Sequence, residues 1–434
     1  LALGVWAAAI AFRPILAAPV GVAILVWWTL GARTRWLGAF LGAALLLPPL
    51  PIPIGDSGPH PSLVFAALGL FAGTLWMAEW RVPANSLTLA FAALFATLLI
   101  SVGPAMWNSG AVAAAGSAAR VLLFGIPVYV FFYTAYGPAQ GIDAARSVRW
   151  LFAAAVLAAL FACVDFYFQF PAPAGYGPQF VWLDSGVYRR AQGLFYEAST
   201  LGNFCAFFLV MIAVAFSRPR EESPMPRKWL AIGAAVLLAA LVLSYSRASL
   251  LNVAIAVAVL VWRNRRRVPL TRVAMLAAAA ALVTWLVFPT FVEAYWLRIS
   301  GTAEYFFTAT EGVLSGRVAS WRTLVDWLAA NPWLALTGIG YKTLPYTDYL
   351  GAPLVADNMY LSLLVETGIA GLAALVWLNI AILRAALRAR DSLFSTWILC
   401  FWAGQVVQMA SGDLLTYWRV LPVYFFVLAL AVRV

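Results

Sequence analysis

Long apolar runs, separated by short polar breaks, follow one another along this chain. Most of the runs approach the roughly 20 apolar residues that a helix needs to cross a bilayer. Of the 434 residues, 64% are hydrophobic and only 10% are charged, whereas a soluble domain carries about 25% charged residues. A soluble fold has no interior large enough for this sequence, so the pattern predicts an all-α polytopic membrane protein.

The polar breaks place the expected helices. We expect 12 to 14 transmembrane helices in one integral membrane domain over residues 1–434, and no cleavable signal peptide. The expected spans are 14–31, 37–53, 62–79, 87–104, 119–136, 149–170, 194–216, 229–245, 248–262, 271–289, 358–384, 393–410 and 417–432, with a further short helix over 2–12.

The charges in the loops predict the orientation. Arginine and lysine collect in alternate short loops, as in 218–228 and 263–272, and such loops stay in the cytoplasm. The net charge of +11 therefore resides on short loops rather than on one soluble face, so nucleic acid is not an expected partner. The extracytoplasmic segments are then 54–61, 105–118, 171–193, the turn near 246, 290–357 and 411–416.

The longest of these loops, 290–357, is large enough to form a small subdomain outside the membrane. Within it, apolar residues recur at helical spacing over 313–330, and Asn331 and Pro332 should end that helix. A helix of this kind lies on a membrane surface or caps a cavity. The apolar stripe consists of Val318, Trp321, Leu324, Val325 and Leu328.

Two clusters of charged side chains stand at the extracytoplasmic ends of expected spans. Arg189 and Arg190 precede a span that has Glu197 near its start, and such arginines also serve as interfacial anchors. Arg247 follows a tight turn, where a helix-end arginine can bond backbone carbonyls instead. Either cluster therefore has a structural explanation as well as a functional one.

Two further clusters belong to the long loop. Arg317 and Arg322 lie on its expected helix, where a solvated face is the structural alternative. Asp357, followed by Asn358 and Tyr360, stands where the next span needs an N-cap. Capping would be a sufficient structural reason for Asp357.

Together the clusters place several arginines and at least one carboxylate on one side of the membrane. Arginine binds phosphate oxygens through two parallel hydrogen bonds, and a carboxylate with a pKa near neutral takes a proton from an attacking hydroxyl. This combination favours transfer from a phosphate-activated, lipid-borne donor, with arginines stabilising the departing diphosphate. Such a site needs no metal or other cofactor, and the single histidine, His60, excludes a multi-histidine metal site.

Five short motifs between residues 185 and 375 carry a resemblance to a known family. They are Arg-Ala-Gln-Gly-Leu-Phe-Tyr-Glu-Ala-Ser (190–199), Ser-Arg-Ala (246–248), Ser-Gly-Arg with a following Trp (315–321), Gly-Ile-Gly-Tyr (338–341) and Asp-Asn-Met-Tyr-Leu with Glu-Thr-Gly-Ile-Ala-Gly (357–371). In this order they resemble the O-antigen ligase and O-antigen polymerase superfamily. The last motif is the most specific of the five.

The resemblance implies a glycosyltransferase of the GT-C type in the bacterial inner membrane, with its active site facing the periplasm. Its donor would be a glycan on undecaprenyl diphosphate, and its acceptor a sugar hydroxyl. The matching motif positions imply that Arg190 and Arg317 bind the diphosphate. The residues expected to help hold the substrate are Arg189, Arg247, Arg322, Asn358 and Tyr360.

The family's ligases carry histidine where this chain has Asp357. An unperturbed aspartate has a pKa of about 3.9 and is a weak base, which burial would strengthen and nearby arginines would weaken. We therefore expect Asp357, or Glu197 as a second choice, to deprotonate the acceptor. Direct displacement by that hydroxyl inverts the anomeric centre. The missing histidine favours an O-antigen or exopolysaccharide polymerase, with a chain-length regulator as a candidate partner.

Two alternatives stay open. A ligase would pass the finished glycan to the lipid A core, and its loss would leave long chains on the lipid carrier. A transporter or flippase for lipid-linked sugars would place ionisable residues near the bilayer midplane in repeated halves. Asp165 and Glu366 are the charges expected at that depth, although the sequence shows no repeated halves.

Overall fold

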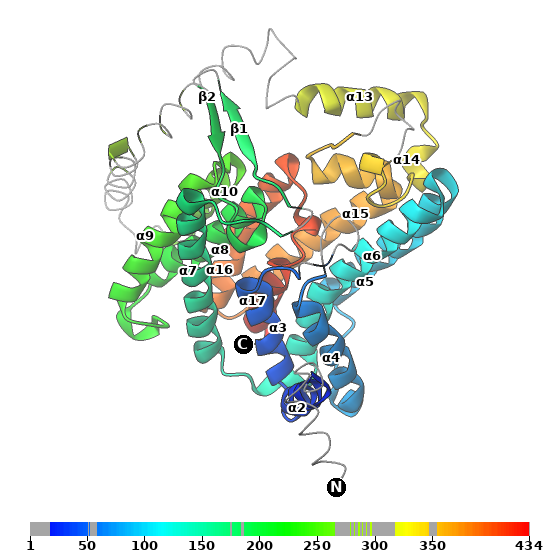
Figure 1. The fold of residues 1–434 in the computed structure, drawn as a ribbon. Coiled ribbons are helices and arrows are strands. Elements are labelled where there is room, and N and C mark those ends of the chain that lie inside the picture. Colours follow the sequence, from blue (N-terminus) through cyan, green and yellow to red (C-terminus); the bar gives the residue numbers. More distant parts are fainter. Residues whose placement is uncertain are drawn as a thin grey trace, which may run out of the picture.

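The computed structural model describes residues 18–50, 52, 59–173, 176–183, 186–264, 278, 282, 285–286, 289, 292, 296, 317–346 and 354–433. The expected features over 2–12, 271–289 and 290–316 lie wholly or largely outside this part of the chain. The described residues form a helical bundle with one two-stranded hairpin (Figure 1), which confirms the predicted all-α fold class.

Every predicted span within the described residues contains a helix. The first are α2 (Ala18–Leu30), α3 (Arg35–Leu46), α4 (Ser62–Leu75), α5 (Ser86–Ile100), α6 (Val102–Tyr136), α7 (Ala144–Phe168) and α8 (Ala198–Ser217). They are followed by α9 (Arg227–Leu243), α10 (Arg247–Arg263), α13 (Arg317–Ala330), α14 (Leu334–Thr337), α15 (Met359–Arg388), α16 (Leu393–Gln408) and α17 (Leu421–Val432).

Length and apolar composition suit the bundle to a bilayer. Among the described residues, 5 helical stretches are long and apolar enough to cross a membrane. They are Ser86–Tyr136, Ala144–Phe168, Ala198–Ser217, Met359–Arg388 and Leu393–Ser411. The chain is therefore a polytopic membrane protein, as its sequence predicts.

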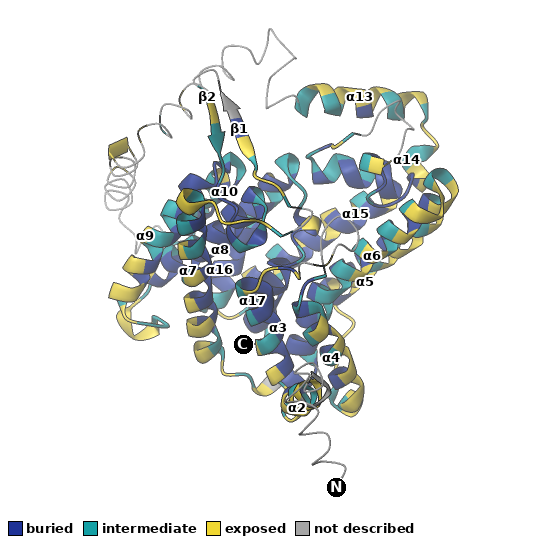
Figure 2. Ribbon diagram, viewed as in Figure 1, coloured by how far each residue is buried: buried dark blue, intermediate teal, exposed yellow. Residues whose placement is uncertain are grey.

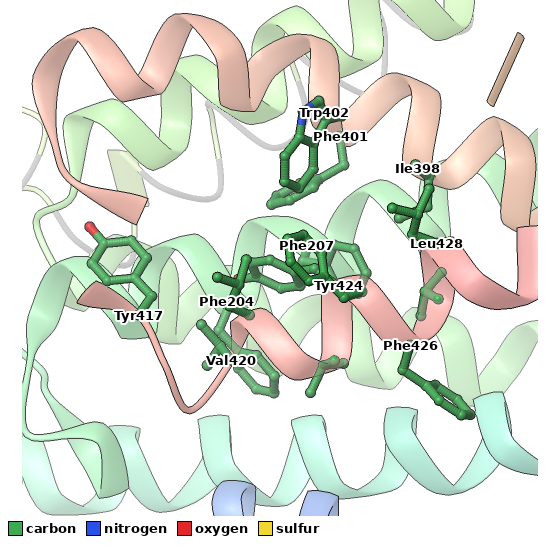
Figure 3. Close-up of a cluster of buried hydrophobic side chains, with 14 of the residues drawn as sticks. Phe204, Phe207, Ile398, Phe401, Trp402, Tyr417, Val420, Tyr424, Phe426 and Leu428 are labelled. Atoms are coloured by element: carbon green, nitrogen blue, oxygen red, sulfur yellow. The ribbon is translucent and has the colours of Figure 1, made fainter. Parts of the chain in front are cut away.

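An aromatic core fills the centre of the bundle, where side chains of α8, α16 and α17 meet (Figure 3). The ring centroid of Phe207 on α8 lies 4.3 Å from that of Trp397 and 4.4 Å from that of Tyr424. Buried polar side chains here bond to one another: Asn203 donates to Gln405 at 2.7 Å and accepts from the Tyr424 hydroxyl at 2.6 Å. Figure 2 shows α8 buried along most of its length, as expected of a helix that is apolar all round.

The segment over 105–118 is a helix rather than the predicted extracytoplasmic loop. It forms the first part of α6, which is interrupted at Gly110 by a backbone φ of 83°. Alanine, glycine and serine dominate this stretch. These small residues have a lower hydropathy than the neighbouring spans, so the sequence analysis predicted a loop where the chain is helical.

The predicted loop over 171–193 contains an antiparallel hairpin of β1 (Phe180–Leu183) and β2 (Gly186–Arg189). Phe180 pairs with Arg189, and Val181 pairs with Tyr188. Two strands of four residues leave too little alternation to be seen in the sequence. The hairpin matters because it delivers Arg190 to the neighbouring turn between α9 and α10, and Arg189 to α7.

Residues 317–346, which we call the cap, comprise α13, α14 and the turn that follows them. As predicted, α13 extends to Ala330 and ends at Asn331, whose side-chain nitrogen donates to Trp327 O at 2.9 Å. Leu324, Ile339 and Leu344 of the cap form a small core with Ala356 and with Val365 of α15. Val325 of the predicted apolar stripe is 53% exposed, whereas Trp327 packs on this core.

The connections between helices gather at two ends of the bundle. At one end, which we call the basic end, Asp391 pairs with Arg218 and Arg263, and Arg33 pairs with Glu79. The hairpin, the cap and the turn between α9 and α10 lie at the other end, which we call the site end (Figure 1). The arginine-rich loops and the candidate site residues therefore occupy opposite ends.

Candidate active site

Arg190 is fixed against the turn between α9 and α10. Its Nε donates to Ser244 O at 2.9 Å, and its backbone nitrogen donates to Gln179 O at 2.8 Å. The next backbone nitrogen, of Ala191, donates to Leu243 O at 2.8 Å. These bonds hold the arginine near Glu197, and its positive charge favours the ionised form of the Glu197 carboxyl.

Glu197 stands at the N-terminus of α8 without capping it. Its Oε2 accepts a hydrogen bond from the Thr200 hydroxyl at 2.6 Å. Burial raises the pKa of this carboxyl, Thr200 and Arg190 lower it, and the carboxylates of Asp357 and Asp413 raise it again. The balance leaves its pKa above the ordinary glutamate value, which suits a general base better than an exposed carboxylate.

Asp357 meets Arg317 across the start of the cap. Arg317 Nε donates to Asp357 Oδ2 at 3.0 Å, and the two side chains are 29% and 46% exposed. One turn further along α13, the Trp321 indole donates to Ala356 O at 2.6 Å. The first residues of α13 are thus tied to the residues that precede α15.

The structural alternative for Asp357 is wrong. Asn358 is the N-cap of α15, and its Oδ1 accepts from the backbone nitrogens of Tyr360 and Leu361 at 3.1 and 3.2 Å. Asp357 instead has a φ of 45° and directs its carboxylate to Arg317. The sequence therefore predicts an N-cap for α15 in this turn, but at Asp357 rather than at Asn358, one residue too early.

Asn358 and Tyr360 both make hydrogen bonds that stabilise the start of α15, which the sequence did not predict. Asn358 caps α15, and the Tyr360 hydroxyl donates to Val406 O on α16 at 2.7 Å. These bonds join the start of α15 to its neighbours. Their expected contact with substrate stays a prediction.

Arg189 is directed to a different partner from Arg190. Its guanidinium lies 3.7 Å from Asp165 Oδ2, and both side chains are mostly buried. Asp165 occupies the last turn of α7 rather than the middle of a span, so the predicted mid-membrane position is wrong. Arg189 therefore connects the hairpin to α7.

Arg247 and Arg322 flank the site differently. Arg247 is the first residue of α10 and follows Ser246, whose hydroxyl bonds that of Ser249 at 2.7 Å. Arg322 is exposed on α13, and among the described residues it has no hydrogen bond or ion pair. The structure thus brings Arg190, Arg317, Glu197 and Asp357 together and leaves Arg322 at the surface.

Sequence reasoning missed three further residues beside this group. Lys342 pairs with Asp413 of the connection between α16 and α17. Tyr417, in the same connection, is buried, and its hydroxyl points away from the aromatic core in Figure 3. Burial, Glu197 and the two aspartates raise the pKa of Tyr417 well above its ordinary value. The sequence did offer one signal for this pair: Lys342 is a basic residue in a segment predicted to be extracytoplasmic, where basic residues are disfavoured.

His60 is a structural residue. Its imidazole nitrogens bond the Ser62 hydroxyl at 2.8 Å and Leu47 O at 2.9 Å. Burial, together with the charge of Arg419, lowers its pKa to about 4. Across the described part of the chain, no group of three or more histidine, cysteine, aspartate or glutamate residues is arranged to hold a metal ion.

Residues 232–376 match the family model described as O-Antigen ligase. The match confirms the predicted O-antigen ligase and polymerase superfamily. It extends from α9 into α15 and so includes Arg317, Lys342 and Asp357, whereas Arg190 and Glu197 lie before it. The match supports a membrane enzyme of the O-antigen ligase or polymerase type. A search of curated proteins found no match.

Proposed function

We propose that this protein is a GT-C type glycosyltransferase that polymerises lipid-linked repeat units at the periplasmic face of a bacterial inner membrane. The donor is a glycan on undecaprenyl diphosphate, and the acceptor is a sugar hydroxyl of a second unit. The observation that carries the proposal is the meeting of Arg190 and Arg317 with the Glu197 and Asp357 carboxylates at one end of the bundle.

The chemistry follows from the charges of these residues. Arg317 and Arg190 hold the diphosphate and stabilise the negative charge that grows on it as the sugar departs. The acceptor oxygen forms a bond to the anomeric carbon while the bond from that carbon to the diphosphate oxygen breaks. The proton of the acceptor hydroxyl passes to a carboxylate, and displacement on one side of the sugar inverts the anomeric centre.

Glu197 is the better base of the two carboxylates. Its pKa is raised by burial and by neighbouring carboxylates, whereas Asp357 is engaged by the Arg317 guanidinium. Two carboxylates in unequal environments can divide the tasks of proton transfer and electrostatic support. Asp357 then orients Arg317 towards the diphosphate, and Glu197 accepts the proton.

The deciding experiment is elongation of purified lipid-linked repeats by the detergent-purified protein. We expect Arg317→Ala to lose on the order of 10²–10³-fold in kcat/KM, because a charge-stabilising donor is removed. Arg33→Ala, which removes an arginine at the basic end, is the matched control and should keep the wild-type rate. Full elongation by a folded Arg317→Ala protein would contradict the proposal.

A ligase is the second candidate, favoured by the description of the matched family. It differs from a polymerase only in the acceptor, so the same arginines and base would serve. Offering the purified protein both a lipid-linked repeat and a lipid A core acceptor distinguishes the two. A product that grows by repeats supports the polymerase, and a single transfer to the core supports the ligase.

A further inference from the structure

Gln179 stands at the base of the hairpin, opposite Arg190. It directly precedes β1, and Arg190 directly follows β2. The backbone oxygen of Gln179 accepts from the backbone nitrogen of Arg190 at 2.8 Å, which continues the pairing of Phe180 with Arg189 by one residue. The hairpin therefore brings Gln179 to the part of the site end where Arg190 lies.

The side chain of Gln179 reaches the first turn of α8. Its Oε1 accepts a hydrogen bond from the backbone nitrogen of Ala198, the first residue of that helix, at 2.9 Å. The first four N–H groups of a helix have no partner within it and need an acceptor from outside. Because the two residues lie 19 positions apart, α8 is capped by a different segment of the chain.

Glu197 has the backbone of an N-cap residue without the usual bond. Its φ of −143° and ψ of 120° are the extended angles of that position. An N-cap side chain ordinarily accepts from the backbone N–H of the second or third helical residue. Glu197 Oε2 instead accepts from the Thr200 hydroxyl at 2.6 Å, its one hydrogen-bond partner in the described part of the chain. This arrangement leaves Oε1 available to a substrate hydroxyl.

Gln192 fixes both Gln179 and the residue before Glu197. It is 5% exposed, and its Oε1 accepts from the backbone nitrogen of Gln179 at 3.1 Å. Its Nε2 donates to Gly177 O at 3.0 Å and to Tyr196 O at 2.8 Å. Tyr196 has a φ of 55°, which is uncommon for a residue with a Cβ. One buried amide thus holds the hairpin base and the turn into α8 together.

We propose that Gln179, held by Gln192, caps α8 in place of Glu197 and so keeps the Glu197 carboxyl free to take the proton of the acceptor hydroxyl. The inference rests on the proposed role of Glu197 and assigns the two glutamines as positioning residues. When Gln179 cannot accept a hydrogen bond, Glu197 is the side chain in the N-cap position. A carboxylate that bonds a helix N-terminus is stabilised in its charged form and is a weaker base.

The first measurement is the rate of elongation of purified lipid-linked repeats. Gln179→Met keeps the length of the side chain but has only a weak acceptor, so kcat should fall on the order of tenfold with little change in KM. Gln179→Glu keeps an acceptor oxygen and should restore most of the rate. Gln169→Met, at the exposed glutamine that ends α7, is the matched control and should keep the wild-type kcat.

A double variant with Glu197→Gln separates positioning from general support of the fold. If Gln179 acts through Glu197, its substitution should cost nothing more once the base has been removed. The double variant should therefore have the same kcat as Glu197→Gln alone. A further tenfold loss would overturn the inference, because Gln179 would then support transfer independently of Glu197.

Hydrogen exchange at single amides, in the purified protein without substrate, tests the capping without turnover. The Ala198 N–H should exchange on the order of tenfold faster in Gln179→Met, and at the wild-type rate in Gln179→Glu and Glu197→Gln. Unchanged protection of Ala198 in folded Gln179→Met, or its loss in Glu197→Gln, would overturn the inference. Absence of transfer by the wild type would defeat the proposed function, and exchange would still decide the capping. If Gln179→Met does not fold, Gln179→Asn, which is one methylene shorter, replaces it.

Discussion

Two ion pairs, one at each end of the helical bundle, differ in their exposure to solvent. At the basic end, the Arg33 and Glu79 side chains of one ion pair are 54% and 33% exposed. At the site end, the Lys342 and Asp413 side chains are 13% and 15% exposed. Exposed pairs contribute little to stability, whereas desolvated pairs strongly affect neighbouring charges. Of the two pairs, Lys342–Asp413 is therefore the one whose loss should disturb its neighbours more strongly.

The backbone shows the same difference. The non-glycine residues with positive φ in the described part of the chain are Gln169, Tyr196, Tyr245, Lys342 and Asp357, and all lie at the site end. Such conformations cost of order 1–3 kcal/mol each and persist where the surrounding structure imposes them. The site end thus holds strained positions that the basic end does not share.

The largest effect should come from Glu197→Gln, which removes the proposed base. We expect kcat/KM to fall by roughly 10²–10⁴-fold, the range for a general base. In the wild type, activity should fall as pH drops through the raised pKa of Glu197, because the base must be unprotonated. That limb should lie above the ordinary glutamate range in a pH profile of kcat/KM. A limb within the ordinary range would remove the argument for Glu197.

The strained backbone at the site end predicts the next largest effect, a loss of stability when a side chain is added at Gly338. A Cβ at Gly338 would lie 2.3 Å from Glu366 O, and the φ of 68° disfavours any side chain. Gly338→Ala should therefore lower the free energy of unfolding by at least about 1–3 kcal/mol. Gly38→Ala in α3 is the matched control, since nothing lies within 4 Å of its Cβ. Equal thermal stability of the two variants would contradict the difference between the ends.

Asp357→Asn should have a smaller effect on catalysis. The amide keeps the size of the side chain but removes the charge that orients Arg317, so we expect about a tenfold fall in kcat/KM, equivalent to ~1.4 kcal/mol. Loss of a like charge should also lower the pKa of Glu197. If Asp357→Asn abolishes transfer while Glu197→Gln retains it, the two carboxylates have exchanged roles.

The smallest effect is expected at the basic end. Arg33→Ala breaks an exposed ion pair with Glu79, and such pairs contribute about 0–1 kcal/mol. Chemical denaturation in detergent should show a change no larger than this. A change comparable with that of Gly338→Ala would mean that the basic end is as constrained as the site end.

The sequence predicted what depends on composition over one helical length. Apolar runs located the spans of α7, α8 and α15, and spacing located α13. The first part of α6 was missed because its small residues lower the hydropathy. Strands β1 and β2 were missed because four residues carry too little pattern.

Prediction of the site stopped where long-range contacts begin. Arg190, Glu197, Arg317 and Asp357 were recognised by their charge at unusual positions. The ion pair of Lys342 with Asp413 joins residues 71 positions apart, so no local motif contains it. Asparagine and aspartate cap helices about equally well, so residue type does not decide between Asp357 and Asn358. The backbone angles make Asn358 the N-cap of α15.

The cap meets α15 where that helix is interrupted at Gly368, which has a φ of 71°, and the contact is reciprocal. A side chain at Gly338 would strike Glu366 O, and one at Gly368 would lie 2.4 Å from Leu336 O. Each segment therefore packs so closely against the other that neither has room for a side chain at its glycine. Chimeric proteins that exchange these segments between relatives should therefore transfer 334–344 and 363–369 as one unit, because either segment alone would meet a partner of the wrong shape.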